Sequence, residues 1–577
     1  MAEMKSVGAL LRRSVERNPG KVAHIVPWAE RGEVTYAQLW EYVTIAAWRM
    51  DSRGIKRGDR ICAYSENCFG WSVLDWACFC LGVVLVPIYP SLPGDQAGFI
   101  VNDSEAKIIY CGSEKLQAQV EPHISVPTVY LGSAPEDFFR LMDEGRATMP
   151  ADYEAQLLAI IENASLDDLA TIIYTSGTTG SPKGAMLPNR AFVKLCENIH
   201  SQLPVDENDL FLSWLPLSHV YERFAGHVLP MALGGQIAHS QGIASLGSEL
   251  TKHRPTIMLC VPRFLESLKD RISDAAAKQG GLKAKLFGWA VAQGKVARAG
   301  GFAPFHGVLD KVVASKIRAR TGGRLKFFVS GGGALPAHVS GFYRALGIEA
   351  LQGYGLTETC AATSINHPLR NRPDTIGEPI NGLEMKIASD GEILIRGYSV
   401  MTGYYNQPEA TAASIDADGW FHTGDIGVQD GNHFRITDRK KDIIVLANGK
   451  NVAPQPIENK LRESALIKEV ALFGDGMSVI CGLVVPDFER LTRLALEAGI
   501  KVADPKELVK LPAIREMFKA EIDVVNRGLA DFERLRKYEV LPNEFSVDGG
   551  ELTPSLKVRR KVVREKYKDL IDGMSGG

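Results

Sequence analysis

The sequence predicts an α/β fold with more than one domain. Short β-rich runs alternate with helical patterns along the first 356 residues, and strands that alternate with helices are joined by crossovers that favour a mainly parallel sheet. A length of 577 residues is too great for one compact core. With 45% hydrophobic and 23% charged residues, the composition is that of a folded globular protein rather than a disordered or fibrous one.

The individual elements follow from these patterns. Residues 37–50 carry a helical pattern. The strands expected in this part of the chain are residues 60–64, 83–88, 107–110, 171–174, 257–259 and 325–329. The longest apolar run, residues 76–89, has the length of a core helix that runs into a strand, and it is shorter than the ~20 residues needed to span a bilayer.

The pattern of predicted elements changes after Pro379. Shorter β-runs with Gly-rich turns follow at residues 384–387, 392–396 and 433–436, which predicts a smaller, β-rich and more antiparallel sub-domain. Residues 438–442 form a charged junction. The remaining sequence again mixes strands and helices and is long enough for a separate small α+β domain.

Charge and cysteine content exclude several classes of protein. The formal net charge of −2 gives no general attraction to nucleic acid, so any polyanion must be bound locally. Nine cysteines, an odd number without a C-x-x-C pair, favour a reducing compartment, and the N-terminal residues lack the apolar core of a signal peptide. We therefore expect a cytoplasmic protein whose membrane contact, if any, is peripheral at the inner membrane surface. No His-Glu-x-x-His or Gly-x-Ser-x-Gly string supports a zinc or serine hydrolase.

The most informative segment is residues 174–184, which read Tyr-Thr-Ser-Gly-Thr-Thr-Gly-Ser-Pro-Lys-Gly. Three glycines, five hydroxyl side chains and one lysine after a strand are the ingredients of a polyphosphate-binding loop. A Walker A loop would need Gly-Lys-Ser or Gly-Lys-Thr, whereas Lys183 here lies between Pro182 and Gly184. Composition alone leaves an ordinary surface loop as the more frequent alternative.

This string resembles the signature loop of the adenylate-forming superfamily, and four further motifs occur in the order of that family. Residues 352–358 look like its adenine and magnesium motif, and residues 420–425 resemble its ribose motif. Residues 438–442 resemble the interdomain hinge, and residues 552–560 resemble the motif with the catalytic lysine. The resemblance covers nearly the whole chain.

The resemblance implies ATP and Mg²⁺ as cofactors and coenzyme A as co-substrate. The nucleotide-binding residues that it implies are Thr175, Ser176, Gly177, Thr178, Thr179, Gly180, Lys183, Gly332, Gln352, Gly353, Tyr354, Gly355, Thr357, Asp425 and Arg439. Thr175 and Glu358 would be the metal ligands, which suits an ion that takes few protein ligands and keeps several waters. Without the resemblance, a surface acid beside a turn is as good an interpretation of Glu358 as a metal ligand.

The resemblance implies specific roles for Tyr354, Asp425 and Arg439 within the nucleotide site. Tyr354, whose flanking glycines suggest an exposed ring, would stack on adenine. Asp425 would accept hydrogen bonds from the ribose hydroxyls with Arg439 assisting, although Thr-Gly-Asp is also common in loops and a charge cluster is usually solvated.

The catalytic residues implied by the resemblance are Lys557, Glu358, Thr175 and His219. Lys557 lies in a basic tail that would otherwise be read as a solvated helix face. Attack of a carboxylate on the α-phosphate brings two anions together, so a cation must neutralise the oxygens. The resemblance makes Lys557 that cation and Lys441 the hinge, with a mobile C-terminal domain over residues 441–577 and an N-terminal domain over residues 1–440. His219 would orient the acyl carboxylate, although a lone histidine is more often a packing residue.

Residues 214–223, 283–329 and 330–333 look like the long-chain acyl-CoA synthetase branch. The expected partners are therefore a fatty acid and coenzyme A, and the expected reaction is formation of an acyl-adenylate followed by transfer to the thiol, because AMP is a better leaving group than the oxygen of a free acid. After Thr-Gly-Asp-Ile-Gly, the sequence lacks the tryptophan and proline usual in the branch, which leaves the acyl chain length open. Two alternatives are transfer to a carrier protein's phosphopantetheine arm and a catalytically silent lipid-associated scaffold.

A basic segment lies between residues 281 and 325. It holds nine Lys or Arg residues and only Asp310 as an acid, interleaved with Leu, Phe, Trp and Val. The more usual interpretation is an exposed helical pair with a solvated basic face. The functional alternative is a surface that rests on anionic lipid.

Substitution of Lys557 tests whether this residue acts in acyl-adenylate formation but not in thioester formation, as the resemblance implies. We expect Lys557→Ala to reduce acyl-adenylate formation by orders of magnitude, because charge on the α-phosphate is no longer neutralised, and to spare thioester formation from supplied acyl-adenylate. Pyrophosphate release and thioester formation are measured separately. Equal loss of both half-reactions would contradict this role of Lys557.

Overall fold

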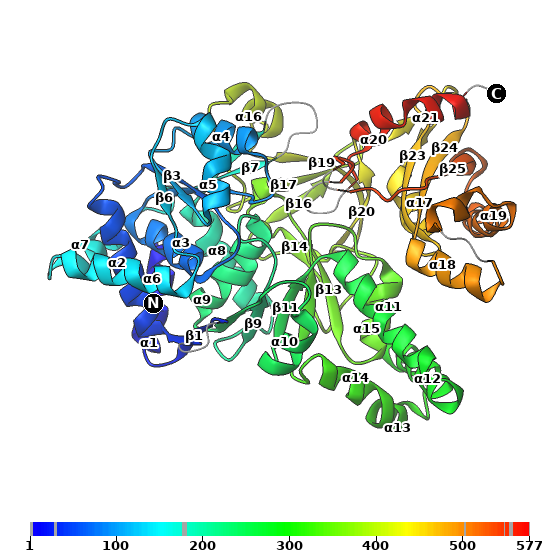
Figure 1. Cartoon of the computed structure of the whole chain (residues 1–577), viewed down its shortest axis with the longest axis horizontal. Coiled ribbons are helices and arrows are strands. Elements are labelled where there is room, and N and C mark those ends of the chain that lie inside the picture. Colours follow the sequence, from blue (N-terminus) through cyan, green and yellow to red (C-terminus); the bar gives the residue numbers. More distant parts are fainter. Residues whose placement is uncertain are drawn as a thin grey trace. The chain divides into compact units, whose positions relative to one another are not determined.

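The fold was obtained as a computed structural model that describes residues 4–27, 32–175, 182–500, 504–546, 549–552 and 558–575 (Figure 1). The chain forms two compact units. The first comprises residues 1–386, 394–423 and 430–434, and the second comprises residues 387–393, 424–429 and 435–577. The mixed α/β class expected from the sequence is confirmed.

A seven-stranded sheet in the first unit has the order β18-β8-β7-β4-β3-β5-β6. Its strands are β3 (Arg60–Tyr64), β4 (Val84–Ile88), β5 (Ile109–Cys111), β6 (Thr128–Tyr130), β7 (Leu169–Thr175), β8 (Lys183–Pro188) and β18 (Gly403–Tyr404). Strands β7, β4, β3, β5 and β6 are parallel, whereas β8 runs antiparallel to both β7 and β18. The expected strand at 60–64 is confirmed, and the one at 107–110 starts two residues later.

A nine-stranded sheet in the same unit has the order β15-β14-β13-β12-β11-β9-β10-β1-β2. Its strands are β1 (Val22–Ile25), β2 (Glu33–Thr35), β9 (Leu210–Ser213), β10 (Gln236–His239), β11 (Ile257–Cys260), β12 (Phe327–Ser330), β13 (Glu349–Tyr354), β14 (Ser364–Ile365) and β15 (Glu378–Pro379). The six central strands are parallel, and β2, β14 and β15 are antiparallel. The carboxyl ends of β12 and β13 are therefore neighbours at one edge.

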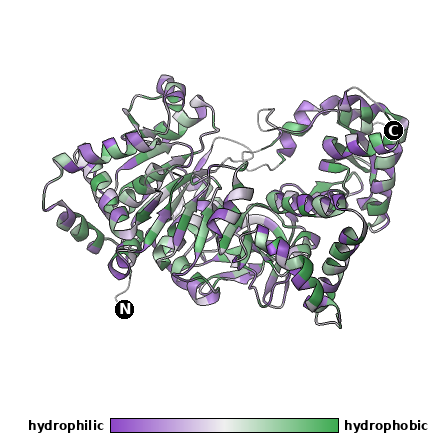
Figure 2. Cartoon of the chain, turned by 60° about the horizontal axis from the view of Figure 1, so that its bottom comes forward, coloured by the Kyte–Doolittle hydropathy of each residue, from purple (hydrophilic) through white to green (hydrophobic). Residues whose placement is uncertain are grey.

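Helices lie beside the strands of both sheets (Figure 1). The strands are rich in hydrophobic residues (Figure 2). The α-helices of this unit are α1 (Val7–Arg17), α2 (Tyr36–Asp51), α3 (Phe69–Leu81), α4 (Gly94–Asp103), α5 (Glu114–Val120), α6 (Pro135–Thr148), α7 (Tyr153–Glu162), α8 (Asn189–Gln202), α9 (Leu229–Leu233), α10 (Leu246–His253), α11 (Pro262–Lys278), α12 (Gly281–Arg298), α13 (His306–Leu309), α14 (Ser315–Arg320), α15 (Ala337–Ala345) and α16 (Pro408–Ser414). The apolar run 76–89 is the end of α3 followed by β4, with Gly82 between them in a left-handed conformation that ends the helix. Across the described ranges, no helix is both long and apolar enough to cross a bilayer.

Four strands lie where the chain passes between the units, namely β16 (Glu384–Ile387), β17 (Glu392–Arg396), β19 (Phe421–Asp430) and β20 (His433–Arg439). The first two have the expected bounds, and β20 extends three residues beyond the expected 433–436. The ribose-motif residue Asp425 therefore lies within a strand rather than in a loop.

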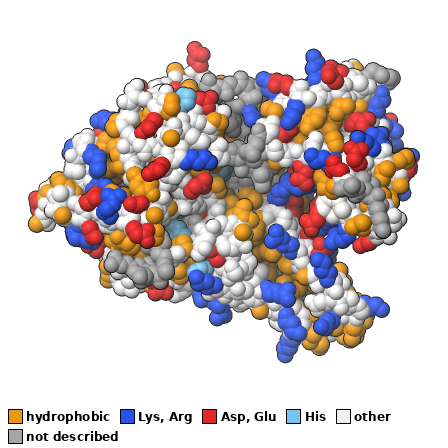
Figure 3. All heavy atoms as spheres, viewed as in Figure 1, with side chains coloured by type: hydrophobic (Ala, Val, Ile, Leu, Met, Phe, Trp, Pro, Cys, Tyr) orange, Lys and Arg blue, Asp and Glu red, His pale blue; other side chains and the backbone are white. Residues whose placement is uncertain are grey.

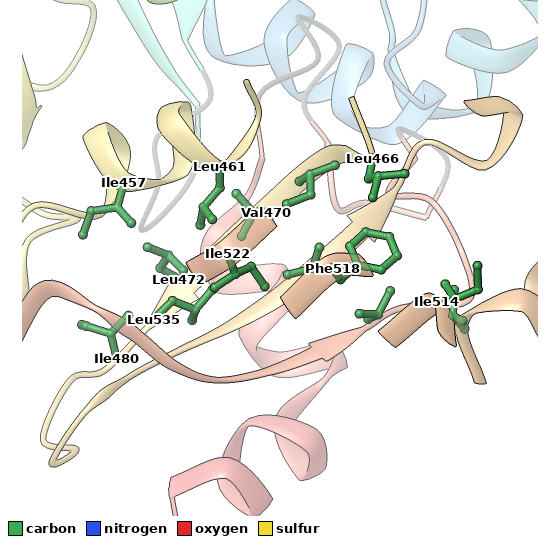
Figure 4. Packing of buried hydrophobic residues seen from close by; sticks show 14 of the residues in the cluster. Ile457, Leu461, Leu466, Val470, Leu472, Ile480, Ile514, Phe518, Ile522 and Leu535 are labelled. Atoms are coloured by element: carbon green, nitrogen blue, oxygen red, sulfur yellow. The ribbon is translucent and has the colours of Figure 1, made fainter. Parts of the chain in front are cut away.

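The second unit has its own hydrophobic core. Its remaining elements are β21 (Ile444–Val445), β22 (Asn451–Val452), α17 (Pro454–Leu461), β23 (Ile467–Phe473), β24 (Ile480–Pro486), α18 (Phe488–Glu497), α19 (Pro512–Asn526), β25 (Leu535–Val540), α20 (Arg560–Lys566) and α21 (Lys568–Ser575). Strand β24 pairs antiparallel with β23 and parallel with β25. Figure 4 shows Val470, Leu472 and Leu535 from this sheet facing Phe518 and Ile522 of α19. This packing explains how the unit can fold around its own centre.

A buried ion pair lies inside the first unit. The guanidinium of Arg223 donates to both carboxylate oxygens of Asp75 on α3, at 2.9 and 2.5 Å, and to the Thr171 hydroxyl on β7 at 2.6 Å. Both charged side chains are fully buried. Burial alone would raise the pKa of Asp75, but the adjacent Arg223 outweighs it and the pKa lies below its usual value.

Glu222, the neighbour of Arg223, is buried without a counter-ion among the described residues. It begins a π-helical segment, Glu222–Val228, and one of its oxygens accepts a hydrogen bond from Ser213 at 2.6 Å. The other oxygen has no partner in the described parts of the chain. Burial raises the pKa of Glu222 to about 8, although the Ser213 hydroxyl opposes the shift.

We expect Glu222→Gln to change how the stability of the first unit depends on pH. Because the folded pKa lies above the usual 4.5, the contribution of Glu222 is fully present below about pH 4.5 and is lost as the pH rises to about 8, by up to ~1.4 kcal/mol per pH unit. Relative to the wild type, the free energy of unfolding of the variant should rise across this window.

Urea unfolding followed by tryptophan fluorescence measures this effect, because all eight tryptophans lie in the first unit. The exposed Glu162 on α7 provides the control substitution Glu162→Gln. Parallel pH profiles for wild type and Glu222→Gln would refute a protonated Glu222.

Candidate functional site

The predicted phosphate loop connects two antiparallel strands. Thr175 ends β7 and pairs with Lys183, the first residue of β8, and the Thr175 hydroxyl lies 3.4 Å from the Lys183 carbonyl oxygen. The chain therefore returns as a hairpin and does not open a helix, in agreement with the rejection of a Walker A loop. The predicted residues Ser176, Gly177, Thr178, Thr179 and Gly180 lie outside the described residues, and their roles stay predictions.

Glu358 is held in a strained turn after β13. Strand β13 ends at Tyr354, and Thr357–Thr359 forms one turn of 3₁₀ helix. The next two residues, Cys360 and Ala361, have φ values of 53° and 70°, which non-glycine residues rarely adopt. A side chain on Gly355 would lie 2.2 Å from the Ala361 carbonyl oxygen, so only glycine permits this reversal.

Tyr404 connects Glu358 with Lys183. Its hydroxyl donates to a Glu358 carboxylate oxygen at 2.9 Å, and the Lys183 ammonium lies 5.1 Å from the centre of its ring. Burial raises the pKa of Tyr404, and the Glu358 carboxylate raises it further. The structure thus brings two predicted residues, Lys183 and Glu358, to one tyrosine, and Thr175 pairs with Lys183 on the neighbouring strand.

Sequence reasoning missed Tyr404. It lies in the two-residue strand β18, which pairs with β8 across more than 200 residues of chain, with Tyr404 opposite Ala185. Two adjacent tyrosines after a glycine are the only local signal, and that signal does not reveal which strand they join.

The edge formed by β12 and β13 holds the other predicted nucleotide residues of this unit. Ser330 and Gln352 are register partners, so Gly332, two residues after β12, and Gly353, within β13, lie at the same end of adjacent strands. The buried Gln352 side chain accepts a hydrogen bond from the Leu335 backbone at 2.9 Å, and Gly332 has a left-handed φ of 77° with open space where a Cβ would lie. Tyr354 is half-buried rather than exposed, because its strand pairs with β14 through Ser364.

His219 lies in the connection after β9. Its Nδ1 accepts a hydrogen bond from the Tyr221 backbone at 3.1 Å, so a proton on the neutral ring is carried by Nε2. The ring is half-buried and lies edge-on to Tyr89, with centroids 6.3 Å apart. The hydroxyl of Tyr221 in turn donates to the Val329 carbonyl of β12 at 2.8 Å, which fixes this connection against the nine-stranded sheet.

Asp425 and Arg439 lie side by side in the second unit, as expected from the ribose motif. Arg439 Nε is 3.2 Å from an oxygen of the buried Asp425. Two backbone bonds support the strand at this point, from Lys440 to the Gly424 carbonyl at 2.8 Å and from Gly424 to the Glu392 carboxylate at 2.7 Å. The carboxylate of Asp425 is therefore held by its neighbours rather than by a flexible loop.

The hinge candidate Lys441 is exposed, and it follows a buried acid. Asp438 accepts hydrogen bonds from the backbones of Arg439 and Gln455 at 2.6 and 3.3 Å, and burial raises its pKa to about 6. The predicted catalytic Lys557 lies outside the described residues. Its role and the pivot role of Lys441 stay predictions.

Comparison with known proteins identifies the family. The family of AMP-binding enzymes matches residues 11–405, and the AMP-binding enzyme C-terminal domain matches residues 441–575. A long-chain-fatty-acid–CoA ligase of Mycobacterium bovis is 34% identical over 563 residues, which cover 94% of this chain and 92% of that protein. A peroxisomal long chain acyl-CoA synthetase of Arabidopsis thaliana is 32% identical over 90% of this chain and 78% of that protein.

Solved structures share the fold. ATP-bound MatB of Rhodopseudomonas palustris superposes with a TM-score of 0.70 at 21% identity, and covers 98% of this chain and 99% of that chain. A fatty acyl CoA synthetase of Mycobacterium tuberculosis gives a TM-score of 0.64 at 23% identity, with coverage of 98% and 99%. The chain belongs to the AMP-binding enzymes, the adenylate-forming superfamily, on its long-chain acyl-CoA synthetase branch.

Proposed function

We propose that the protein activates a fatty acid of long chain length with ATP and transfers the acyl group to coenzyme A, with release of AMP and pyrophosphate. The observation that carries this proposal is identity of 34% over 94% of the chain with a long-chain-fatty-acid–CoA ligase, together with five ordered motifs. The contacts of Lys183 and Glu358 with Tyr404, together with the pairing of Thr175 with Lys183, add a physical basis.

These side chains suit a polyphosphate in the adenylation step. The Lys183 ammonium supplies positive charge beside the loop, and the Thr175 hydroxyl is a donor and acceptor at its first residue. In the proposed reaction a carboxylate oxygen of the acid forms a bond to the α-phosphorus while the bond to the departing pyrophosphate breaks. Lys183 and the proposed Lys557 neutralise the phosphate oxygens, and His219 orients the acid.

Thr175 and Glu358 have the donor chemistry that a magnesium ion requires. Mg²⁺ binds through one or two protein oxygens and keeps waters or phosphate oxygens as its other ligands. A carboxylate in a rigid turn and a strand-end hydroxyl therefore fit it, whereas a cage of three or more acidic, histidine or cysteine side chains is absent from the described residues. The ion, when bound, would reduce the negative charge of the phosphates.

Asp425 and Arg439 suit the ribose. A ribose diol has two hydroxyl donors, and the Asp425 carboxylate accepts both without needing a proton of its own. Arg439, 3.2 Å away, holds this carboxylate in place and balances its charge.

After adenylation the thiol of coenzyme A attacks the activated carbonyl, and AMP leaves.

An acid panel with defined acceptors tests the proposal. We expect AMP release to depend on a long-chain acid, ATP, Mg²⁺ and coenzyme A together, and to be slow with short or aromatic acids. Replacing coenzyme A by a carrier protein with its phosphopantetheine arm should give no acyl transfer. Transfer to the carrier alone would establish a different acceptor, and absence of acid-dependent ATP–pyrophosphate exchange across the panel would refute adenylation altogether.

Tyr404→Phe tests the positioning of Glu358. The phenyl ring keeps the contact with Lys183 but loses the hydrogen bond to the carboxylate. We expect a three- to tenfold higher Mg²⁺ concentration for half-maximal ATP–pyrophosphate exchange, corresponding to the roughly 1 kcal/mol that one hydrogen bond typically contributes.

The matched control is Tyr405→Phe, because Tyr405 is the adjacent residue and its ring lies 5.9 Å from the Arg60 guanidinium instead. Its Mg²⁺ dependence should equal that of the wild type. Identical Mg²⁺ curves for Tyr404→Phe and the wild type would show that Tyr404 does not position Glu358 for a metal.

A further inference from the structure

The segment from α12 to α14 exposes an unusual number of large hydrophobic side chains. Single exposed hydrophobic residues are common, whereas a cluster of them marks an interaction surface. Seven of the fourteen that the described chain exposes lie in this segment, namely Leu282, Trp289, Val296, Phe302, Phe305, Val308 and Val312. We call these seven, with the basic residues between 281 and 325, the α12–α14 surface.

Helix α12 is apolar on two opposite faces. Its inner face packs on α15 and the core, because Phe287 contacts Phe342 at 6.3 Å between ring centroids and a side chain on Gly294 would lie 2.0 Å from the Ala345 carbonyl oxygen. Leu282, Trp289 and Val296 recur at seven-residue spacing on the other face. Trp289 is 59% exposed and Leu282 68%, so the fold itself does not use this second stripe.

The turn after α12 continues the apolar surface. Phe302 is 89% exposed and Phe305 is 66% exposed, and both lie between the two helical parts of the segment. Two aromatic rings in this exposed turn lose contact with water only if something outside the described structure covers them.

The charge of the same surface is strongly positive. Its only acid, Asp310, is held by both terminal nitrogens of Arg318 at 2.7 Å. None of the other eight basic side chains forms an ion pair with an acidic residue in the described parts of the chain; they are Lys283, Lys285, Lys295, Arg298, Lys311, Lys316, Arg320 and Arg324. Figure 3 shows Lys and Arg side chains gathered over this protruding part, beside hydrophobic ones.

We propose that the α12–α14 surface docks the protein onto a bilayer that contains anionic phospholipid. Trp289, Phe302 and Phe305 enter the headgroup and acyl boundary, and the lysines contact the lipid phosphates. Aromatic rings between unpaired basic residues match the two chemistries that such an interface offers, negative charge outside and hydrocarbon beneath. The proposal concerns residues outside the proposed nucleotide site and goes beyond the proposed reaction.

Vesicle binding by the full chain tests the proposal. The probes are vesicles of phosphatidylcholine with and without phosphatidylglycerol, and bound protein is measured by co-sedimentation. We expect binding only with phosphatidylglycerol, and weaker binding as salt screens the charges. Fluorescence of Trp289 should be quenched by bromine-labelled acyl chains, and this quenching should be lost in Trp289→Phe.

Two sets of variants separate charge from apolar insertion. Lys283→Glu with Lys285→Glu and Lys295→Glu should lower the partition coefficient by about tenfold or more, as should Phe302→Ser with Phe305→Ser. The matched controls are Lys5→Glu with Lys115→Glu and Lys460→Glu, which are exposed lysines elsewhere, and Leu369→Ser, whose side chain is 85% exposed. The controls should bind as the wild type does.

Circular-dichroism melting verifies that every variant is folded, and none of the altered residues belongs to the proposed active site. Failure of the wild type to bind phosphatidylglycerol vesicles, or equal binding by all variants, would overturn the proposal. Loss of self-association in the patch variants, measured by light scattering without any vesicle binding, would instead assign the surface to a second copy of the chain. These outcomes do not depend on whether the protein ligates coenzyme A.

Discussion

The buried pair of Arg223 with Asp75 is the interaction on which the arrangement of the first unit depends. Arg223 binds α3 and, through Thr171, strand β7, while the adjacent Glu222 binds Ser213 at the end of β9. Two consecutive side chains thus connect elements of both large sheets. Breaking a buried pair by removing one partner typically costs 3–5 kcal/mol, because an uncompensated charge remains.

This connection lies close in the chain to the proposed chemistry. Thr171 is four residues before Thr175 on β7, and the Arg223 backbone donates to the His219 carbonyl at 3.0 Å. The strand that begins the phosphate loop and the histidine that orients the acid in the proposal are therefore both bonded to Arg223, the strand through the guanidinium and the histidine through the backbone. A site that must balance several negative charges needs such rigid supports, because flexible donors would have to reorganise during the reaction.

The sequence predicted the elements well and the contacts between distant segments poorly. Strands such as β3 and β17 have the expected bounds because their hydrophobic runs are short and end at turn residues. The structure places Lys183 and Glu358 beside one tyrosine and Asp425 beside Arg439, and the roles that the five motifs imply for these residues stay predictions. Tyr404 and the Asp75–Arg223 pair were not predicted, because pairing across 148 residues or, for Tyr404 with β8, more than 200 residues leaves no local periodicity. The burial of Tyr354 likewise depends on its pairing with β14, a strand of only two residues that no sequence pattern predicts.

The interleaving of the two units along the chain limits how the protein can be divided. Residues 387–393 and 424–429 belong to the second unit although they precede residue 435. A fragment that begins at residue 441 would therefore lack Glu392, Asp425 and Arg439, and would lose the backbone bond between Lys440 and Gly424. If the two units were expressed separately, the C-terminal fragment would have to include these inserted segments. A single protease cut near the charged junction therefore cannot release the second unit together with Glu392 and Asp425.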